Sequence, residues 1–487
     1  MAFRSFHKRL KTPTRHYVFL TLLVILVLIV VGFFFLVFET EKPTIAFEND
    51  SGSIARNDTI AVNVGDAKSG LRRVTIEAIQ GNLKKELLIK EYPRHGYIGL
   101  IGPARDRLEA LFSAPNFGFN EGDIELVVTA HDYSLFSHFG SGNKTILKKT
   151  VRLDTKPPTI TLVANKPFIA PGGSGMAIYK LDEPTKEHGV LLNGRLFRGY
   201  PLAGVKDGYV CYFALPYDAT RLEQAVVRAT DLAGNSNTLA LAMRFKPVRW
   251  KHDRIPVSDN FLAMKLPEFA QHYSEMHGTP LEQYIYVNGE VRRANSKKID
   301  EICSKSNEKR LWSGAFLRAK GSAPAGFADH RTYVYNGAEF DKQVHLGMDI
   351  ASLAHAQVRA AGAGTVVFTD YMGIYGNMVL LDHGQGLFSL YAHMSQIDVK
   401  PGDTVAKDGV LGLTGATGMA VGDHLHFSML VQGVFVTPIE WWDPHWIKVN
   451  VDEPLAGVAG GSRSGSPGAP SGSSANGSTG GSAGGSR

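Results

Sequence analysis

Three short histidine motifs between residues 345 and 427 constrain this chain more than any other part of its sequence. The first spans residues 345–349 and reads HLGMD, the second spans 391–393 and reads YAH, and the third spans 424–426 and reads HLH. In a β-strand, residues two or four apart point to the same face. Each motif in an extended segment would therefore aim its polar side chains at one side of a sheet.

The segment that carries these motifs, residues 331–447, has the composition of a β domain. Short apolar runs rich in valine, leucine and aromatic residues alternate with glycine-containing turns, and no long helical period appears. This pattern predicts strands, which we expect at 333–335, 364–368, 378–381, 387–391, 410–413 and 426–430. We expect an antiparallel sheet folded over a groove.

The motifs contain five side chains that can bind a metal ion or move a proton: His345, Asp349, His393, His424 and His426. Catalytic zinc sites typically use three protein ligands and leave one position for water. Two histidines and one aspartate are the best-placed ligands, and two histidines remain. Bound zinc lowers the pKa of its water to roughly 7, while a spare histidine can serve as general base or stabilise charge at a carbonyl. The set indicates metal-assisted amide hydrolysis.

Other histidines nearby are assigned to structural or surface roles. A single histidine in a strand is more often a structural or surface residue than a ligand, and His355, His383 and His445 fall in that class. Five metal-competent residues at strand spacing within one segment are much harder to explain by chance.

The combined motifs resemble the His-x-Gly-x-Asp, Tyr-x-His and His-x-His signatures of the lysostaphin/LytM-type zinc metallopeptidases, which are peptidoglycan endopeptidases. The resemblance covers residues 331–447 and extends to the surrounding glycine turns, 376–377, 382–384, 401–403 and 415–418. It implies one zinc ion per domain, held by His345, Asp349 and His426. It also implies that His393 and His424 are the catalytic pair flanking the zinc water.

The N-terminus has the features of a membrane anchor. Residues 17–38 carry no charge and are almost wholly apolar; as a helix they would span roughly 33 Å, enough for a bilayer core of about 30 Å. A cleaved signal peptide would have a shorter apolar run and small residues near its end, which this segment lacks. The five basic residues within 1–16 then place the N-terminus in the cytoplasm. We expect a single-pass protein of the bacterial inner (cytoplasmic) membrane with a periplasmic or extracytoplasmic catalytic domain.

The same basic residues account for most of the net charge of +6. Outside residues 1–16, 47 basic residues stand against 46 acidic ones. Nucleic-acid binding therefore has little electrostatic support, and no nucleic-acid partner is expected.

Residues 42–154 and 156–247 are predicted to be two tandem β-sandwiches. Both are dense in short β-branched runs, and a weak internal repeat relates them: a Pro-led first strand, and a late strand that ends in Asp231-Leu-Ala-Gly-Asn235 in the second copy. These features resemble bacterial immunoglobulin-like modules. A spacer role is favoured over binding of a glycan or an envelope protein partner, because no cluster of exposed aromatic or charged residues is visible.

A small α/β lead-in is expected over residues 249–330. Capped helices are predicted to start near Ser258 and Thr279, and a third over 297–305. The segment has no motif of its own, and we expect it to pack on the next domain and shape a wall of its groove. Its acidic and histidine residues are interpreted as a solvated helix face rather than a metal site: Glu268, His272, Glu275 and His277.

Two further expectations concern the cysteines and the C-terminus. Cys211 and Cys303 lie in different predicted domains without CxxC neighbours, so two buried thiols are at least as well supported as a disulfide. Residues 456–487 are predicted to be a disordered Gly/Ser tail, because the composition cannot bury enough apolar surface.

Two functions follow from these features. The first is a membrane-anchored zinc metalloendopeptidase that cuts peptide bonds in peptidoglycan stem peptides or cross-links. The alternative is a non-enzymatic envelope factor that binds peptidoglycan or activates another cell-wall hydrolase. The complete set of five residues favours the first. A zinc protease acting on proteins also fits the residues, since both kinds of substrate present amides.

Overall fold

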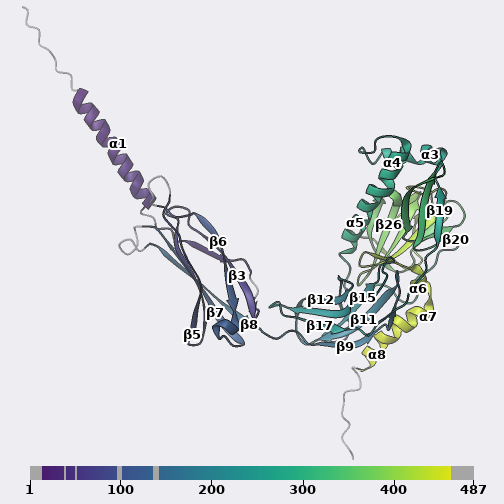
Figure 1. Cartoon of the computed structure of the whole chain (residues 1–487), viewed down its shortest axis with the longest axis horizontal. Coiled ribbons are helices and arrows are strands. Elements are labelled where there is room, and N and C mark those ends of the chain that lie inside the picture. Colours follow the sequence, from purple (N-terminus) through teal and green to yellow (C-terminus); the bar gives the residue numbers. More distant parts are fainter. Residues whose placement is uncertain (1–13, 38–39, 50–51, 96–100, 135–141, 462–487) are drawn as a thin grey trace, which may run out of the picture. The chain divides into compact units, whose positions relative to one another are not determined.

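The computed structural model of this 487-residue protein is mainly β and describes residues 14–37, 40–49, 52–95, 101–134 and 142–461 (Figure 1). These residues form two compact units. The first comprises residues 1–159 with the short segments 183–187 and 229–237, and the second comprises the rest of the chain.

The N-terminal helix α1 (Thr14–Val37) coincides with most of the predicted membrane anchor. Its side chains are described over residues 17–32. Within the described part of the chain, no helix is both long and apolar enough to cross a membrane. The anchor at 17–38 therefore stays a prediction, and the basic segment 1–16 lies mostly outside the described residues.

The first unit contains a two-sheet sandwich. One sheet has the order β1 (Thr44–Phe47), β3 (Asn57–Gly65), β6 (Arg105–Ser113); the other has the order β2 (Ser53–Ile54), β8 (Lys144–Leu153), β7 (Gly122–Asp132), β4 (Leu71–Gln80), β5 (Leu83–Glu91). A short helix, α2 (Ala114–Phe117), follows β6. Alternating apolar residues of both sheets meet in one core, as Val62 and Leu108 do with Ile76 and Val128.

Two four-stranded sheets follow in residues 160–245. One has the order β14 (Tyr200–Pro201), β15 (Gly208–Ala214), β11 (Ser174–Leu181), β9 (Ile160–Asn165); the other has the order β13 (Arg195–Arg198), β12 (Thr185–Leu192), β16 (Ala225–Asp231), β17 (Ser236–Ala240). The short strands β10 (Phe168–Ile169) and β18 (Arg244–Phe245) pair separately. The predicted strand-rich segments 42–154 and 156–247 contain all of these strands, while their immunoglobulin-like character stays a prediction.

The second sandwich packs on the domain at 331–447. The Nζ atom of Lys166 lies 3.0 Å from a carboxylate oxygen of Glu440, and the backbone N–H of Ser174 donates to the other oxygen at 2.7 Å. Most of the second sandwich belongs to the same compact unit as that domain. The second sandwich therefore contacts the domain directly and does not only connect it to the preceding part of the chain.

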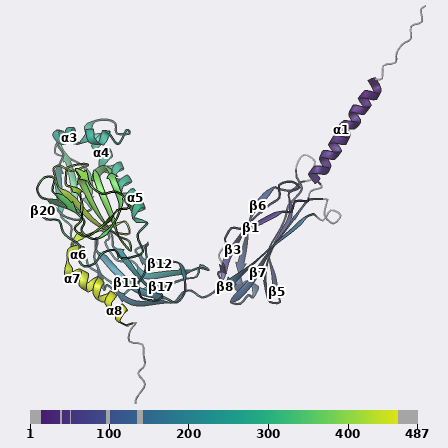
Figure 2. The ribbon, with the colours of Figure 1, turned by 180° about the vertical axis from the view of Figure 1, so that it is seen from behind.

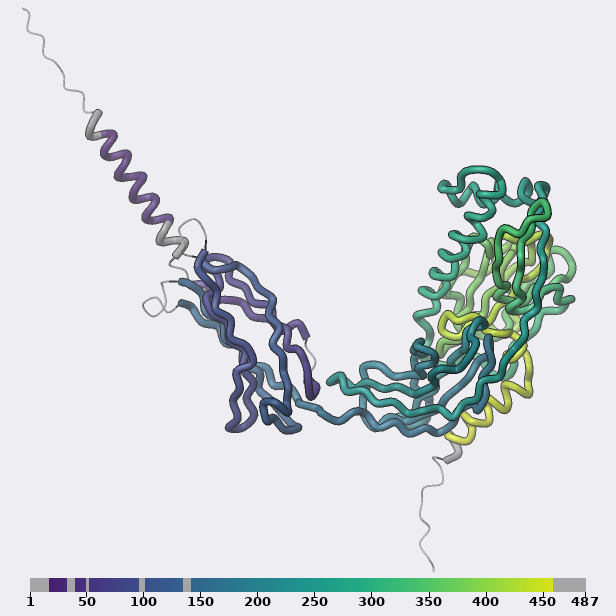
Figure 3. Tube along the Cα trace, in the orientation of Figure 1, coloured from purple at the N-terminus to yellow at the C-terminus, as the bar shows by residue number. Residues whose placement is uncertain are grey.

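The lead-in forms helices at the predicted caps. Helix α3 (Asp259–Ala270) is capped by Ser258, and α4 (Pro280–Tyr286) begins with a reciprocal capping box between Thr279 and Glu282. The third helix starts earlier than its predicted range of 297–305, because a π-helical segment, η1 (Val287–Val291), joins α4 to α5 (Arg292–Cys303) in one continuous run (Figure 3). The lead-in also supplies two edge strands, β19 (His252–Pro256) and β20 (Ser322–Ala325).

The predicted antiparallel sheet is present at 331–447. Its main sheet has the order β20, β23 (Met348–Ala351), β31 (Leu425–Val431), β27 (Leu387–Met394), β26 (Asn377–Gly384), β25 (Gly364–Tyr371), β29 (Thr404–Val405), with β32 (Val434–Val436) paired to β31. Two small sheets flank it: β19, β21 (Asp329–Tyr335), β22 (Ala338–His345); and β24 (Gln357–Arg359), β30 (Val410–Leu413), β28 (Gln396–Ile397). All six strand segments expected from the sequence are strands.

Helices close the described chain: α6 (Pro438–Trp442), α7 (Pro444–Ile447), η3 (Lys448–Asp452) and α8 (Glu453–Gly461). They run beside the second sandwich in both ribbon views (Figures 1 and 2). Residues 456–461 of the predicted tail are therefore helical, because they continue the helix that starts at Glu453; residues 462–487 lie outside the described part. Cys211 and Cys303 are both free and buried.

Candidate active site

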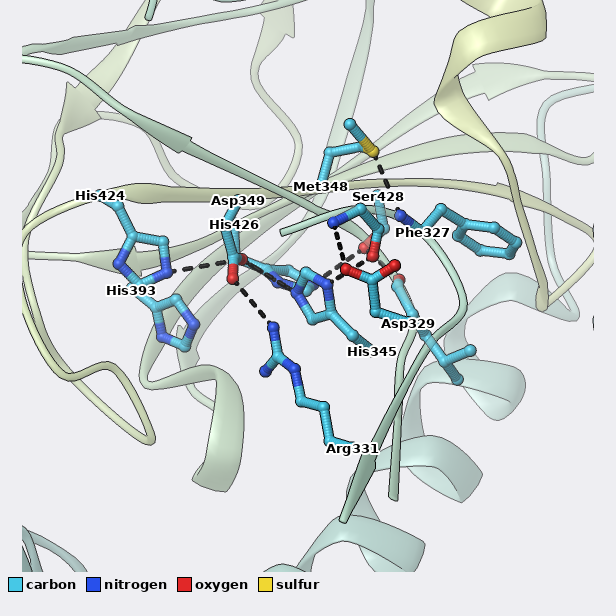
Figure 4. Close-up of polar contacts among 12 residues, drawn as sticks. Phe327, Asp329, Arg331, His345, Met348, Asp349, His393, His424, His426 and Ser428 are labelled. Atoms are coloured by element: carbon cyan, nitrogen blue, oxygen red, sulfur yellow. Dashed lines mark hydrogen bonds and ion pairs between the residues drawn. The ribbon is translucent and has the colours of Figure 1, made fainter. Parts of the chain in front are cut away.

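Three neighbouring segments bring His345, Asp349 and His426 together. His345 ends β22, Asp349 lies on β23, and His426 lies directly opposite Asp349 in the pairing of β23 with β31. The Nε2 atom of His345 lies 2.9 Å from Asp349 Oδ1 and 3.0 Å from His426 Nδ1, which is itself 3.0 Å from Asp349 Oδ1 (Figure 4). The register of the strands thus gathers the predicted ligands, although His426 follows Asp349 by 77 residues and His345 by 81.

The glycine of the first motif makes this approach possible. Gly347 lies in the turn between β22 and β23, and a Cβ atom there would be 2.4 Å from His426 Nε2 and 2.7 Å from Ser428 Oγ. No side chain fits at such distances. Gly347 therefore lets the backbone of the first motif come close to the histidine of the third.

Hydrogen bonds to the backbone determine which nitrogen of each histidine faces the cluster. Nδ1 of His345 donates to the carbonyl of Gly326 at 2.8 Å, since a carbonyl only accepts. Ser428 Oγ donates to the carbonyl of Leu346 at 2.7 Å, and so accepts the Nε2 proton of His426 at 3.1 Å. The two nitrogens that face each other both carry lone pairs.

Three acceptor atoms therefore converge without a donor between them: two imidazole nitrogens and one carboxylate oxygen. All lie within 4.8 Å of one another in a buried position. Converging lone pairs repel unless a cation lies among them, and a second hydrogen bond that orients each ligating histidine is typical of metal sites. The residues fit a metal ion of the kind that binds two nitrogens and one oxygen, such as zinc.

The electrostatics of the cluster favour an ionised Asp349 and a neutral His426. Burial by itself would raise the pKa of Asp349, but the neighbouring rings of His345, His424 and His426 outweigh it and hold that pKa well below its usual value. Burial lowers the pKa of His426 to about 4 against the attraction of Asp349. Both groups are thus in the protonation state that binds a metal at neutral pH.

His393 and His424 lie beside this cluster, with ring centroids 4.9 Å apart (Figure 4). Nδ1 of His393 donates to the carbonyl of Thr417 at 2.8 Å, and Nδ1 of His424 donates to that of Gly422 at 2.8 Å. Nε2 of His393 is left free for chemistry, whereas Nε2 of His424 faces Asp349 Oδ1 at 3.4 Å. His393 also has a backbone φ of +63°, a conformation that costs energy in a residue other than glycine and is common at functional sites.

The two histidines differ in their tendency to hold a proton. Burial and then the positive charges of His426 and His424 keep the pKa of His393 well below its usual value. Burial opposes protonation of His424 as well, but the hydrogen bond and charge of Asp349 outweigh it and raise the pKa. One ring is therefore suited to accept a proton and the other to carry one.

Two contributors to the site were not predicted from the sequence. Arg331 on β21 lies 3.3 Å from the second carboxylate oxygen of Asp349, and Ser428 orients His426. Arg331 belongs to no motif. It lies on a different sheet from Asp349, so no spacing along one strand relates the two residues. Ser428 could have been found from its spacing, since it follows His426 by two residues on the same strand face.

The histidines assigned to other roles lie away from the cluster's ligand atoms. His383 is fully buried, donates from Nδ1 to the carbonyl of Ala363 at 2.8 Å, and has Nε2 2.7 Å from Ser389 Oγ. His355 and His445 are exposed. Of the lead-in residues interpreted as a solvated helix face, His272, Glu275 and His277 are exposed but lie between α3 and α4. Glu268 is on α3 but is half-buried and contacts the loop at 415–418. The prediction of one solvated helix face was therefore wrong.

A cavity of about 380 Å³ adjoins the cluster. Its walls come from the β domain and from the lead-in, which contributes Ile255, Phe261, Tyr284 and Arg292. The lining is largely apolar and aromatic, with Arg292 and Arg331 as its guanidinium groups. The lead-in thus forms one wall of the groove, as the sequence predicts.

Comparison with known proteins identifies the domain that carries this site. The model of peptidase family M23 matches residues 343–438. A DD-carboxypeptidase/endopeptidase of Neisseria meningitidis, Mpg, is 36% identical over 97 residues, which are 20% of this chain and 22% of that protein. The peptidoglycan DD-endopeptidase ShyA of Vibrio cholerae is 38% identical over 89 residues, 18% of this chain and 21% of that protein.

Among solved structures, the catalytic domain of lysostaphin from Staphylococcus simulans is 23% identical; the match covers 30% of this chain and 96% of that one, with a TM-score of 0.20. The sequence matches span only about a fifth of the length of the curated relatives. The family model, by contrast, matches the part of the chain that holds all three histidine motifs. Residues 343–438 are therefore a domain of peptidase family M23.

Proposed function

We propose that this protein is a zinc-dependent endopeptidase that hydrolyses peptide bonds in the stem peptides or cross-links of peptidoglycan. The observation that carries the proposal is the convergence of three acceptor atoms, from His345, Asp349 and His426, beside the rings of His393 and His424, each oriented by a backbone carbonyl. The substrate class is supported by the relatives named as peptidoglycan DD-endopeptidases.

Zinc would be held by His345, Asp349 and His426, and when bound it supplies Lewis acidity toward a carbonyl oxygen and toward water. Arg331 sits behind the carboxylate of Asp349. In this arrangement it limits the movement of that side chain and balances its charge.

The two remaining histidines carry the proton chemistry in this proposal. His393 is neutral at pH 7 and is held by Thr417 so that Nε2 accepts the proton of the attacking water. His424 holds its proton more tightly and lies beside Asp349, so its Nε2–H stabilises the developing negative charge on the amide oxygen or protonates the leaving amine. General acid–base catalysis of this type typically contributes 10²- to 10⁴-fold in rate, as an order of magnitude.

We further propose that residues 17–38 anchor the protein in the bacterial inner membrane with residues 40 onward on the outer side. The uncharged apolar run and the basic residues before it support this arrangement. The two sandwiches would then be immunoglobulin-like modules between the anchor and the M23 domain, which would place the active site near the cell wall.

The test is digestion of purified sacculi by the full-length, zinc-loaded protein in detergent. Soluble fragments should appear with the wild type, disappear on chelation and return with added zinc. His393→Ala and His424→Ala should each retain zinc and lose roughly 10²- to 10⁴-fold in rate. Fragment release that persists in both variants would contradict the proposed roles. No release by zinc-loaded wild type from sacculi of several chemotypes would contradict peptidoglycan hydrolysis and favour a binding or activating role.

A further inference from the structure

The loop at residues 415–418 holds His393 in its reactive tautomer. The carbonyl of Thr417 accepts the Nδ1 proton of His393 at 2.8 Å. Thr417 is itself fixed to the β domain, because its hydroxyl donates to the carbonyl of Met394 at 3.0 Å and accepts from the N–H of Asn377 at 3.0 Å. The position of this carbonyl therefore decides which nitrogen of His393 is free.

Two side chains of helix α3 in the lead-in form hydrogen bonds with the same loop, one on each side of Thr417. Lys265 donates from Nζ to the carbonyl of Ala416. Glu268 accepts from the N–H of Gly418 at 2.5 Å. The two side chains also lie 3.5 Å from each other. Peptide groups immediately before and after Thr417 are thus bonded to one helix that precedes the M23 match at 343–438.

Burial of Lys265 supports the importance of this contact. Its side chain is 7% exposed and that of Glu268 is 27% exposed. A buried ammonium group is costly unless it is paired and hydrogen-bonded, and here its partners are the loop and Glu268. Helix α3 offers a firm base, because Leu262, Leu266 and Phe269 are buried in the same apolar core as Met378 and Leu390 of the main sheet.

The 415–418 loop is also closely packed against the neighbouring turn at 373–376. Gly418 has a φ of +66°, and a Cβ atom on Gly376 would lie 2.4 Å from the carbonyl carbon of Thr417. The turn at 373–376 is in turn tied to α5, where buried Asn295 accepts from the N–H of Ile374 at 3.0 Å. Both loops beside His393 are therefore bonded to lead-in helices.

We propose that Lys265 and Glu268 are positioning residues that fix the tautomer and orientation of His393 through the 415–418 loop, so that the lead-in completes the catalytic site of the M23 domain. This inference rests on the proposed function where it assigns His393 the role of base. It concerns residues that touch neither the metal cluster nor the reacting atoms. Loss of the hydrogen bonds between these two side chains and the loop should therefore lower the rate of the chemical step while the metal stays bound.

The kinetic test uses the full-length, zinc-loaded protein and cross-linked muropeptides as the substrate. Glu268→Leu and Lys265→Met should lower kcat roughly 10- to 100-fold, the loss typical of a misplaced catalytic group, with KM and zinc content unchanged. Glu268→Gln keeps an acceptor for Gly418 and should recover most of the rate. Glu275→Leu and Lys297→Met remove exposed residues of the same charges and should leave kcat unchanged.

A spectroscopic test does not depend on turnover. With ¹⁵N-labelled histidine, and with the His393 signals assigned by their loss in His393→Gln, the wild type should show a single tautomer protonated at Nδ1. Glu268→Leu should show a mixture of tautomers, and Glu275→Leu should match the wild type. An unchanged tautomer together with unchanged kcat in Glu268→Leu and Lys265→Met would overturn the inference, as would losses of kcat that follow zinc content. An inactive wild type with the expected tautomer change would overturn the proposed function and leave the positioning role supported.

Discussion

The two histidines of the metal cluster face it through different ring nitrogens, Nε2 in His345 and Nδ1 in His426. Each is fixed by a hydrogen bond from its other nitrogen, to the carbonyl of Gly326 or to Ser428 Oγ. The residue types of the cluster were predictable from motif spacing. The tautomers were not, because they depend on partners that approach from other parts of the fold.

Ser428 gives a direct test of this orientation. Ser428→Ala removes the oxygen that accepts the Nε2 proton of His426, so the ring loses its preferred tautomer and direction. Zinc affinity should fall roughly 10- to 100-fold, as is typical when a partner of a ligating histidine is removed. Competition with a chromophoric chelator measures this change. Ser296→Ala on the exposed face of α5 is the control, and equal affinities in the two variants would contradict the assigned tautomer.

The buried His383 predicts a pH dependence of stability that does not involve the metal cluster. Burial lowers its pKa in the folded protein to about 4 from a usual value of 6.5. The unfolded chain therefore binds more protons than the folded one between these values. The free energy of unfolding should fall as pH falls from 6.5 to 4, by up to about 3 kcal/mol from this group.

Urea unfolding followed by tryptophan fluorescence measures this effect, because all five tryptophans lie in the second unit. His383→Gln should be less stable at neutral pH, but its stability should depend less steeply on pH between 6.5 and 4. The exposed His355→Gln is the control. A slope in His383→Gln equal to that of the wild type would show that His383 is not the buried neutral group.

At the scale of elements, the turn between β22 and β23 joins the first motif to the third. Gly347→Ala places a methyl group 2.4 Å from His426 Nε2, so the turn or the ring must move. We expect zinc binding to be lost while the far-ultraviolet circular dichroism stays that of the wild type. Gly289→Ala, where a Cβ atom meets only Arg293 at 3.8 Å, should bind zinc normally. Stoichiometric zinc in Gly347→Ala would contradict the close packing of this turn.

Sequence patterns predicted the elements better than their contacts. Strands of the M23 domain appear where period and composition indicated them, and the caps of Ser258 and Thr279 start helices because they are local signals. The early start of α5 was missed, since the π-helical segment η1 carries no local signal. Glu268 was misjudged because its partner, Gly418, is 150 residues away.

In the whole molecule, the second sandwich forms a buried contact with helix α6, which begins where the M23 match ends. A spacer would not need such a contact. Glu440 accepts from Lys166 and from the N–H of Ser174, and the side chains of Lys166 and Glu440 are only 12% and 19% exposed. Lys166 also lies 4.7 Å from the ring centroid of Trp446. The second sandwich is therefore packed on its neighbour in the chain rather than merely connected to it.

Glu440→Ala tests that contact. It leaves the N–H of Ser174 without its acceptor and the ammonium of Lys166 with only the carbonyl of Ser174, both partly buried. The loss should cost about 1–3 kcal/mol of unfolding free energy. Tryptophan-monitored urea unfolding measures it, with the exposed Glu301→Ala as control. Equal stability of both variants would mean that the sandwich and the M23 domain are not energetically coupled.

Hydrolysis of peptidoglycan amide bonds by this M23 domain can be followed by mass spectrometry of the products formed in H₂¹⁸O. Sacculi digested by the full-length, zinc-loaded protein should release soluble glycan strands that are uncut and carry cleaved peptides. Each newly formed carboxyl group should contain one ¹⁸O. The same digestion by His393→Ala should release almost none. Fragments with cleaved glycan and uncut peptides, or wild-type products without ¹⁸O at a peptide carboxyl, would contradict the account.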